Sequence, residues 1–358
     1  MVAWIKVKRT TFHKEAFMKQ AIRWICLLTL LVGMALTAFA TGEAESDELV
    51  IGLSLPTQRE ERWVRDGETM EAYAEELGID LRVQVADANT AEQIAQVENL
   101  FAQGIDVLIL APHDAAAASS LVDQAEEEGI PVISYDRLIT NTANLDVYLS
   151  FDNVGVGRIQ GEYFVNNVPD GSNIILLAGA PTDNNAFLFK EGAMEFIQPK
   201  IDSGDYTVIA DQFVDNWLPE NALAIVENAL TTAENDVQGI LAPNDGTAGG
   251  AIVALEAQGL AGDVVVTGQD ASLAGARRIV EGTQGMTVFK DTRELGRAAI
   301  DAAIALAQGE ELDFNGAVDN QVFDVPSILL TPFAVTEDNI EEVLVESGYL
   351  SREDVYGE

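Results

Sequence analysis

Short apolar runs alternate with helix-like stretches along the chain from Leu49 onward. Runs such as Val107–Ala111 are apolar throughout. The strands expected in the first half are Leu49–Leu55, Leu81–Val85, Val107–Ala111, Pro131–Tyr135 and Val147–Phe151, with helices over Glu60–Leu77, Ala91–Ala102 and Ala115–Glu128. Apolar strands separated by helices are typical of parallel sheets that are covered on both faces.

The same alternation repeats in the second half. The expected strands there are Asn173–Ala178, Tyr206–Asp211, Gly239–Ala242, Asp263–Thr267 and Met286–Phe289, with helices over Val154–Asn167, Asn185–Ile197, Glu220–Thr232, Gly246–Ala257 and Leu273–Glu281. The segments Ile105–Asp114 and Val237–Asp245 also have similar sequences. Because 358 residues leave room for about two domains, we predict an α/β fold with two similar domains.

The first 40 residues have the three parts of a secretory signal. Six basic residues and one acidic residue precede the apolar run Trp24–Ala40. The run ends in the small-x-small triplet Ala38-Phe39-Ala40. We predict a signal peptide over residues 1–40, cleaved after Ala40, a flexible leader over residues 41–48, and a periplasmic location. The alternatives are an uncleaved anchor and a start at Met18.

Cysteine and charge narrow the class of protein further. Cys26 is the single cysteine and lies inside the apolar run, so the cleaved chain would hold no disulfide or thiolate metal site. After residue 40 the chain has 14 basic residues against 58 acidic ones. Nucleic acids and anionic membranes are therefore improbable partners, because binding phosphate needs clustered Lys and Arg.

Polar residues follow the predicted strands, where ligands bind in open α/β sheets. They are Arg59, Glu60, Glu61, Arg62 and Trp63 after the first strand, Asp136 and Arg137, Asp183–Asn185, Asp215–Trp217, Asn244 and Asp245, Gln269 and Asp270, and Lys290. Carboxylates, amides and cations can bond to the hydroxyls of a sugar, and a tryptophan face can cover its C–H patch. Agreement at seven strand ends favours a sugar site.

Each of these residues also has a structural alternative. Asp114, Asp215 or Asp245 could cap the following helix, Arg62 could be a solvated charge, and the two tryptophans could belong to the core.

Signals for catalysis are weak. No Gly-x-Gly-x-x-Gly turn follows the first strand, and His113 is the single histidine after residue 40. We predict no catalytic residue, no metal site and no cofactor, although no pattern excludes a pair of glycosidase-type carboxylates.

A series of short motifs lies within about Leu49 to Leu330. They are Glu61-Arg62-Trp63, Ser134–Arg137, Tyr148–Asn153, Pro181–Ala186, Trp217–Asn221, Asn244–Gly250, Gly268–Asp270 and Met286–Lys290. These motifs, in this order, resemble those of the D-xylose-binding proteins of bacterial ABC transporters, which belong to the ribose/galactose type of periplasmic sugar-binding proteins.

The resemblance implies a type I periplasmic binding protein fold, with two Rossmann-like lobes joined by three crossing segments near Asn153, Lys290 and Phe323. The first lobe would hold residues 49–153 and 291–323, and the second residues 154–290 and 324–358. The implied ligand-binding residues are Arg62, Trp63, Asp136 and Arg137 from the first lobe, Asn184, Trp217, Asn244 and Asp270 from the second, and Lys290 from a crossing strand.

The same resemblance implies capture of a monosaccharide by lobe closure and delivery to an ABC permease, by a monomeric protein that a chemoreceptor could also read. Leu55–Gln58 departs from the acidic residues of similar proteins, so arabinose, ribose and glucose remain alternatives to D-xylose. A sugar-sensing regulator and an exported enzyme acting on pentosides are the competing classes.

Overall fold

The computed structural model describes residues 49–357. The predicted signal peptide, its cleavage after Ala40, Cys26 and the leader over residues 41–48 all lie outside the described residues. Within residues 49–357, none of the helices is long and apolar enough to cross a membrane.

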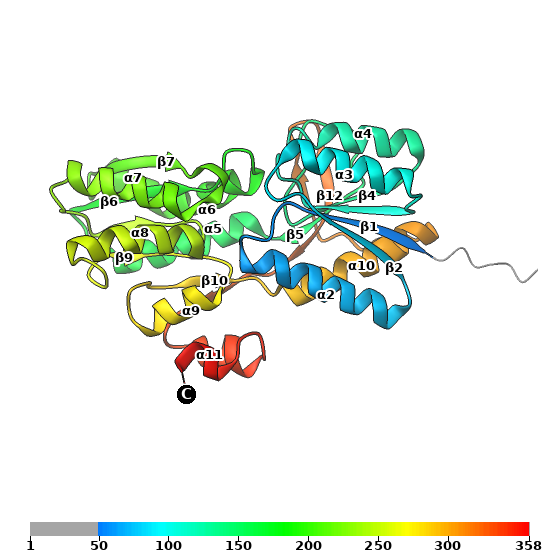
Figure 1. The fold of residues 1–358 in the computed structure, drawn as a ribbon. Helices are drawn as coiled ribbons and strands as arrows, with labels where there is room; N and C mark the ends of the chain where they lie inside the picture. The colour runs from blue at the N-terminus through cyan, green and yellow to red at the C-terminus, as the bar shows by residue number, and fades with distance from the viewer. Residues whose placement is uncertain (1–48, 358) are drawn as a thin grey trace, which may run out of the picture. The chain divides into compact units, whose positions relative to one another are not determined.

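The first lobe is built on a seven-stranded sheet in the order β11-β12-β5-β4-β3-β1-β2 (Figure 1). Its strands are β1 (Val50–Leu55), β2 (Asp80–Val85), β3 (Val107–Leu110), β4 (Val132–Tyr135), β5 (Val147–Phe151), β11 (Gly316–Asp319) and β12 (Asp324–Leu330). All neighbours are parallel except β11, which is antiparallel to β12.

Helices cover both faces of this sheet. On one face, α2 (Glu61–Leu77) and α10 (Thr292–Gln308) pack on Ile51, Leu53 and Leu55 of β1. On the other face lie α3 (Thr90–Ala102) and α4 (Ser119–Glu128). Burial on both faces explains why the central strands are mostly apolar, with only the buried serines Ser54, Ser134 and Ser150 among them.

The second lobe has a four-stranded parallel sheet in the order β7-β6-β8-β9. Its strands are β6 (Ser172–Ala178), β7 (Tyr206–Phe213), β8 (Gly239–Leu241) and β9 (Val265–Val266). The helices are α5 (Asn153–Asn167) and α6 (Asn184–Ser203) on one face, and α7 (Pro219–Thr232) and α8 (Asp245–Gln258) on the other. A short helix, α9 (Leu273–Val280), follows β9. The prediction of two helix-covered parallel sheets is confirmed.

Three segments connect the lobes. β5 leads into α5, β10 (Thr287–Phe289) leads into α10, and β12 leads into β13 (Phe333–Val335), which pairs antiparallel with β10. The first two lie near the predicted positions, Asn153 and Lys290. Beyond β13 the chain forms a π-helical turn over Glu341–Glu346 and α11 (Arg352–Tyr356), which packs near α9.

The prediction that the third crossing lies near Phe323 is wrong. Ser327 and Leu330 of β12 pair in parallel with Tyr148 and Phe151 of β5, so residues 324–330 belong to the first sheet and the crossing follows Leu330. The helix predicted from Ala115 also begins later, at Ser119.

The helices α5 and α6 approach closely because glycines face the contact. A Cβ added to Gly161 would lie 2.5 Å from the carbonyl oxygen of Ala193, and one added to Gly192 would lie 2.0 Å from that of Val154. Such distances leave no room for a methyl group, and backbone atoms cannot move aside as a side chain can.

We expect Gly161→Ala to lower the free energy of unfolding by about 1–3 kcal/mol, because the added methyl forces α5 away from α6. The matched control is Gly67→Ala in α2, where the nearest atom to the added Cβ is the mobile Leu55 Cδ1 at 3.3 Å. Urea denaturation of both variants checks this, and equal stabilities would contradict it.

Candidate functional site

The carboxyl ends of the strands in both lobes surround a small inner cavity. Its volume is about 30 Å³, which is room for a water molecule but not for a sugar ring. It is lined by Glu60, Arg62, Trp63, Asp136, Arg137, Asp183, Asn185, Phe189, Trp217, Asn244, Gln269, Asp270 and Lys290. A ligand of greater size would enter only if the lobes or the lining side chains moved apart.

Buried side chains of alternating charge run across this cavity. Arg62 donates to both oxygens of Asp66 at 3.1 and 3.2 Å, and its Nη1 donates to Asp136 Oδ2 at 2.7 Å. Lys290 Nζ lies 3.6 Å from Asp136 Oδ2 and 3.5 Å from Asp270 Oδ1. The charge chain Asp66–Arg62–Asp136–Lys290–Asp270 therefore joins the core of the first lobe to the second lobe.

The pKa values along the charge chain follow from this pairing. Burial alone would raise the pKa of Asp136, but Arg62 and Lys290 outweigh it and lower the value to about 2. Burial raises the pKa of Asp66, against the opposing effects of Arg62 and of the hydrogen bond from Tyr135. Asp136 is thus a carboxylate at neutral pH, able to accept hydrogen bonds.

A second set of contacts joins the lobes through Asp183. Arg137 Nε of the first lobe lies 2.9 Å from Asp183 Oδ2, to which Trp217 Nε1 also donates at 3.2 Å. Asn185 donates to the carbonyl oxygen of Asp136 at 2.9 Å and accepts from the Tyr148 hydroxyl at 3.0 Å. The inner cavity is therefore enclosed by polar groups that bridge the two lobes.

Aromatic rings complete the enclosure. The guanidinium of Arg62 lies 4.2 Å from the centre of the Trp63 ring, and that of Arg137 lies 5.1 Å from it. Phe189 meets Trp217 edge to face at 6.4 Å. Both tryptophans are buried, so each serves the packing of its lobe and the wall of the cavity at once.

Eight of the nine predicted ligand-binding residues line the inner cavity, and Asn184 does not. Asn184 is the first residue of α6 and is half-buried, while its neighbours Asp183 and Asn185 take the lining positions. Sequence reasoning did not select Glu60, Asp183, Asn185, Phe189 and Gln269. All of these except Phe189 stand in the strand-end groups, so the available signal was their place after a strand.

Helix capping, the alternative interpretation of the strand-end residues, applies to several of them. Asp183 caps α6 by accepting from the backbone of Asn185. Asp114 caps no helix, because it accepts from Ala116 and Ala117 in the turn before α4, whose N-cap residue is Ala118. Asn244 caps α8 through its Oδ1, which accepts from the backbone and hydroxyl of Thr247. Asn244 nevertheless lines the cavity, so capping and ligand binding are compatible roles for this residue.

Several buried polar atoms at the cavity make no hydrogen bond within residues 49–357. They are Glu60 Oε2, Gln269 Oε1 and Asp270 Oδ1, although Asp270 Oδ1 keeps its ionic contact with Lys290. Burial raises the pKa of Glu60. Buried acceptors without donors are costly, and the hydroxyl groups of a ligand would supply the missing donors.

Three lining residues adopt left-handed backbone conformations. The φ angles are 58° at Asp136, 57° at Trp217 and 91° at Asp270. Such angles are uncommon for residues other than glycine, and they cluster at functional sites where surrounding structure holds them. The turn at each position aims the side chain into the cavity.

Asp245 organises the loops of the second lobe behind the cavity. Its Oδ2 accepts from the Ser272 backbone at 2.8 Å, and its Oδ1 accepts from Gln284 Nε2 at 2.7 Å. Burial raises the pKa of Asp245 to about 6. These bonds connect the start of α8, which carries Asn244, to the loop that carries Asp270.

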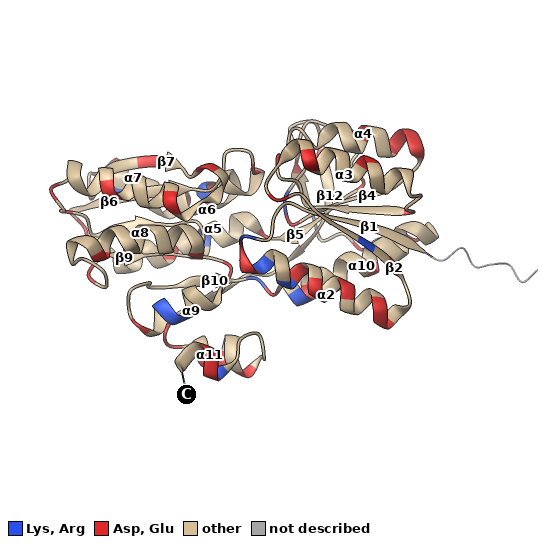
Figure 2. Cartoon of the chain, viewed as in Figure 1, with Lys and Arg blue, Asp and Glu red and all other residues tan. Residues whose placement is uncertain are grey.

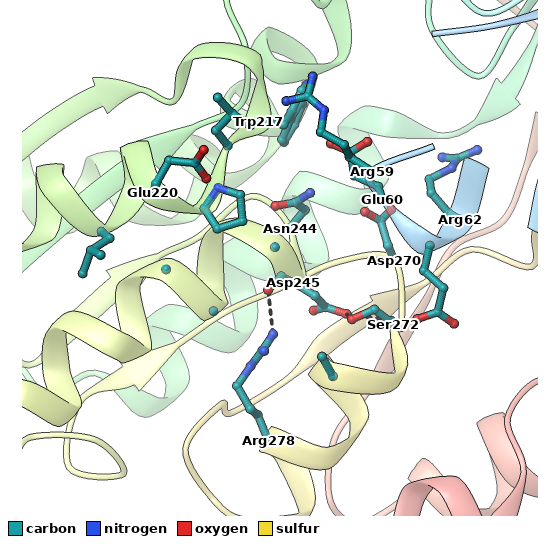
Figure 3. Close-up of a pocket in the computed structure, with 18 of the residues that line it drawn as sticks. Arg59, Glu60, Arg62, Trp217, Glu220, Asn244, Asp245, Asp270, Ser272 and Arg278 are labelled. Carbon is teal, nitrogen blue, oxygen red and sulfur yellow. Dashed lines mark hydrogen bonds between the residues drawn. The ribbon is translucent and has the colours of Figure 1, made fainter. Parts of the chain in front are cut away.

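A larger outer cavity of about 620 Å³ adjoins the inner one. Figure 3 shows Arg59, Glu60 and Arg62 on one side of it and Glu220, Asn244 and Asp245 on the other. The two cavities share Glu60, Arg62, Trp217, Asn244 and Asp270. Four arginines line the outer cavity, Arg59, Arg62, Arg65 and Arg278, and Figure 2 shows blue segments at the start of α2 and on α9.

The match to a known family decides the classification. Residues 51–311 match the profile of the periplasmic binding protein domain. The chain belongs to that family.

Two relatives in the periplasmic binding protein family are similar over nearly their whole length. A D-xylose-binding periplasmic protein from Escherichia coli is 45% identical over 323 residues, covering 90% of this chain and 96% of that protein. One from Haemophilus influenzae is 46% identical over 330 residues, covering 92% and 98%.

A solved structure agrees with the fold of this family member. The carbohydrate transporter solute binding protein from Chloroflexus aurantiacus, in complex with D-glucose, has a TM-score of 0.81 at 38% identity. The alignment covers 86% of this chain and 98% of that one.

The raised pKa of Asp245 predicts a pH dependence of stability. A carboxyl group that holds its proton more tightly when folded adds stability as pH falls from about 6 toward its unfolded value near 3.8. We expect the stability difference between wild type and Asp245→Asn to shift in favour of wild type by up to about 3 kcal/mol between pH 7 and pH 4.

Urea denaturation of both proteins at several pH values measures this difference. The other titrating groups are common to both proteins and cancel in the comparison. A difference that stayed constant from pH 7 to pH 4 would contradict the prediction.

Proposed function

We propose that this protein is an exported solute-binding protein that captures D-xylose between its two lobes and delivers it to an ABC permease. The observation that carries the proposal is the inner cavity, where charged, amide and aromatic side chains from both lobes converge in a chain 45–46% identical to two D-xylose-binding periplasmic proteins. Predicted signal residues 1–40 support export.

The chemistry of the cavity suits a neutral aldose. Arg62, Arg137 and Lys290 can only donate, the carboxylates of Asp136 and Asp270 can only accept, and the amides do both. Sugar hydroxyls can match any of these groups. A site with so many buried polar groups would reject a compound without hydroxyls, since each unmatched group would lose its hydrogen bonds to water.

Capture is proposed to occur by closure of the lobes. The closed arrangement depends on contacts between lobes outside the cavity as well, such as the Glu61 carboxylate accepting from the Leu273 backbone at 3.1 Å and the Ala115 backbone donating to Thr182 at 2.9 Å. A sugar that contacts both lobes would add to these contacts only in the closed form, and so shift the equilibrium toward it.

D-xylose is the proposed ligand because of the names of the two relatives, and glucose is the second candidate because the Chloroflexus aurantiacus protein was solved with it. Within the divergent segment after β1, Thr57 is buried while Gln58 is exposed. Glu60 supplies the carboxylate on this side of the cavity.

We expect the mature chain, residues 41–358, to bind D-xylose one-to-one in isothermal titration and to bind a panel of other aldoses more weakly. A stronger response to D-glucose would keep the mechanism and change the ligand. Failure to bind any sugar would overturn the proposal.

An enzymatic role is the competing class. Incubating the protein with an aryl xyloside and measuring released sugar separates the two, because a receptor leaves the glycosidic bond intact. Release of sugar by pure protein would show that the site is catalytic.

Arg137→Ala is expected to weaken sugar binding by about 10- to 100-fold, because it removes charged donors from the cavity and leaves the buried Asp183 without its cationic partner. The matched control is Arg158→Ala, which removes an exposed ion pair to Glu195 on the surface of the second lobe. Titration of both variants, with melting curves to show that each is folded, tests the role of Arg137. Equal affinities in the two variants would remove Arg137 from the site.

A further inference from the structure

The outer cavity is a second space beside the proposed sugar site. It shares the lining residues Glu60, Arg62, Trp217, Asn244 and Asp270 with the inner cavity, so the two cavities are direct neighbours. Its volume of about 620 Å³ lies within the range of cavities that bind small molecules. The inner cavity is far smaller, at about 30 Å³, and a sugar ring would enter it only if the lobes or the lining side chains moved apart.

The second lobe gives the outer cavity a flat apolar floor. The start of α7 and the first turns of α8 form it, with Leu218, Pro219, Leu223 and Val253. Val253 is 51% exposed, which is unusual for a valine on a helix of an α/β domain. Gly250 lets the two helices meet, because a Cβ there would lie 2.0 Å from the Pro219 carbonyl oxygen.

Polar groups surround this floor from both lobes. Arg59, Glu61 and Arg65 come from the first lobe, and Glu220, Ser272 and Arg278 from the second. Arg278 Nη2 donates to the Asp245 carbonyl oxygen at 2.6 Å, which holds the guanidinium at the edge of the cavity, as the dashed line in Figure 3 shows. An apolar floor with a hydrogen-bonding rim matches a pyranose ring, which has C–H faces and hydroxyl edges.

The outer cavity is also present while the lobes are in contact. The Glu61 carboxylate, which lines it, bonds to the Leu273 backbone of the opposite lobe at 3.1 Å. Contact between the lobes is therefore compatible with an open space beside the inner cavity.

We propose that the site accepts xylose-terminated disaccharides, with one ring in the inner cavity and a second ring on the floor formed by Leu218, Pro219, Leu223 and Val253. This proposal rests on the proposed function and extends it from free pentose to short glycosides. Its specificity-determining residue is Val253, whose side chain borders the second ring and does not line the inner cavity.

The test compares D-xylose and xylobiose by isothermal titration on wild type, Val253→Trp and the matched control Val253→Ala. We expect xylobiose to bind wild type one-to-one in competition with xylose. Val253→Trp should weaken xylobiose by at least about tenfold while xylose stays within about twofold, because the indole fills the outer cavity only. Val253→Ala should leave both ligands within about threefold, and since Val253 is half exposed both variants should fold.

Two outcomes would overturn the inference and leave the proposed function standing. One is xylose binding by wild type without xylobiose binding. The other is equal loss or equal retention of the two ligands in Val253→Trp. Failure of wild type to bind either sugar would instead overturn the proposed function, and the inference with it.

Discussion

The need to pair every buried charge is the constraint on which the rest of this structure depends. An ionised group removed from water is costly unless an opposite charge and hydrogen bonds replace its hydration. The charge chain meets this requirement, because its members alternate in sign from the core of the first lobe to the edge of the second. They are Asp66, Arg62, Asp136, Lys290 and Asp270. The Arg62–Asp136 pair holds α2 beside the end of β4. Lys290 holds the β10 crossing segment beside both lobes through Asp136 and Asp270.

This pairing also explains how a stable lobe can hold a polar binding site. The first lobe pairs Arg62 with two of its own carboxylates, whereas Lys290 and Arg137 find partners that involve the second lobe. Separation of the lobes would remove the carboxylate partner of Arg137 and one of the two carboxylate partners of Lys290. A sugar brings hydroxyls that can occupy the same positions, so binding exchanges one set of polar contacts for another.

The sheets could be predicted from the sequence because their buried strands are mostly apolar, with few polar residues such as Ser54 and Ser134. Most of the residues that line the inner cavity could be predicted because they directly follow those strands. The edge strands β11 and β13 are short and partly exposed, so their pattern is weak. The position of Asn184 was missed because which residue of a helix's first turn faces a cavity depends on tertiary packing. Nothing in the residue types of Asp136, Trp217 and Asp270 announces their left-handed backbone as a glycine would. The outer cavity could not be predicted, since its floor consists of apolar residues such as Leu218, Leu223 and Val253, whose types do not distinguish the wall of a cavity from the core.

The charge chain has a consequence for how such a receptor can change over evolutionary time. Replacing one member of the charge chain leaves a neighbouring buried charge without its partner. An evolutionary path that keeps the protein stable would therefore require paired substitutions. Glu60 and Gln269 line the same cavity outside the charge chain, and each has a side-chain oxygen that makes no hydrogen bond within residues 49–357, so single changes there break none of the ion pairs of the charge chain. New ligand preferences within this lineage should therefore arise first at these uncoupled positions, while the charged framework stays fixed.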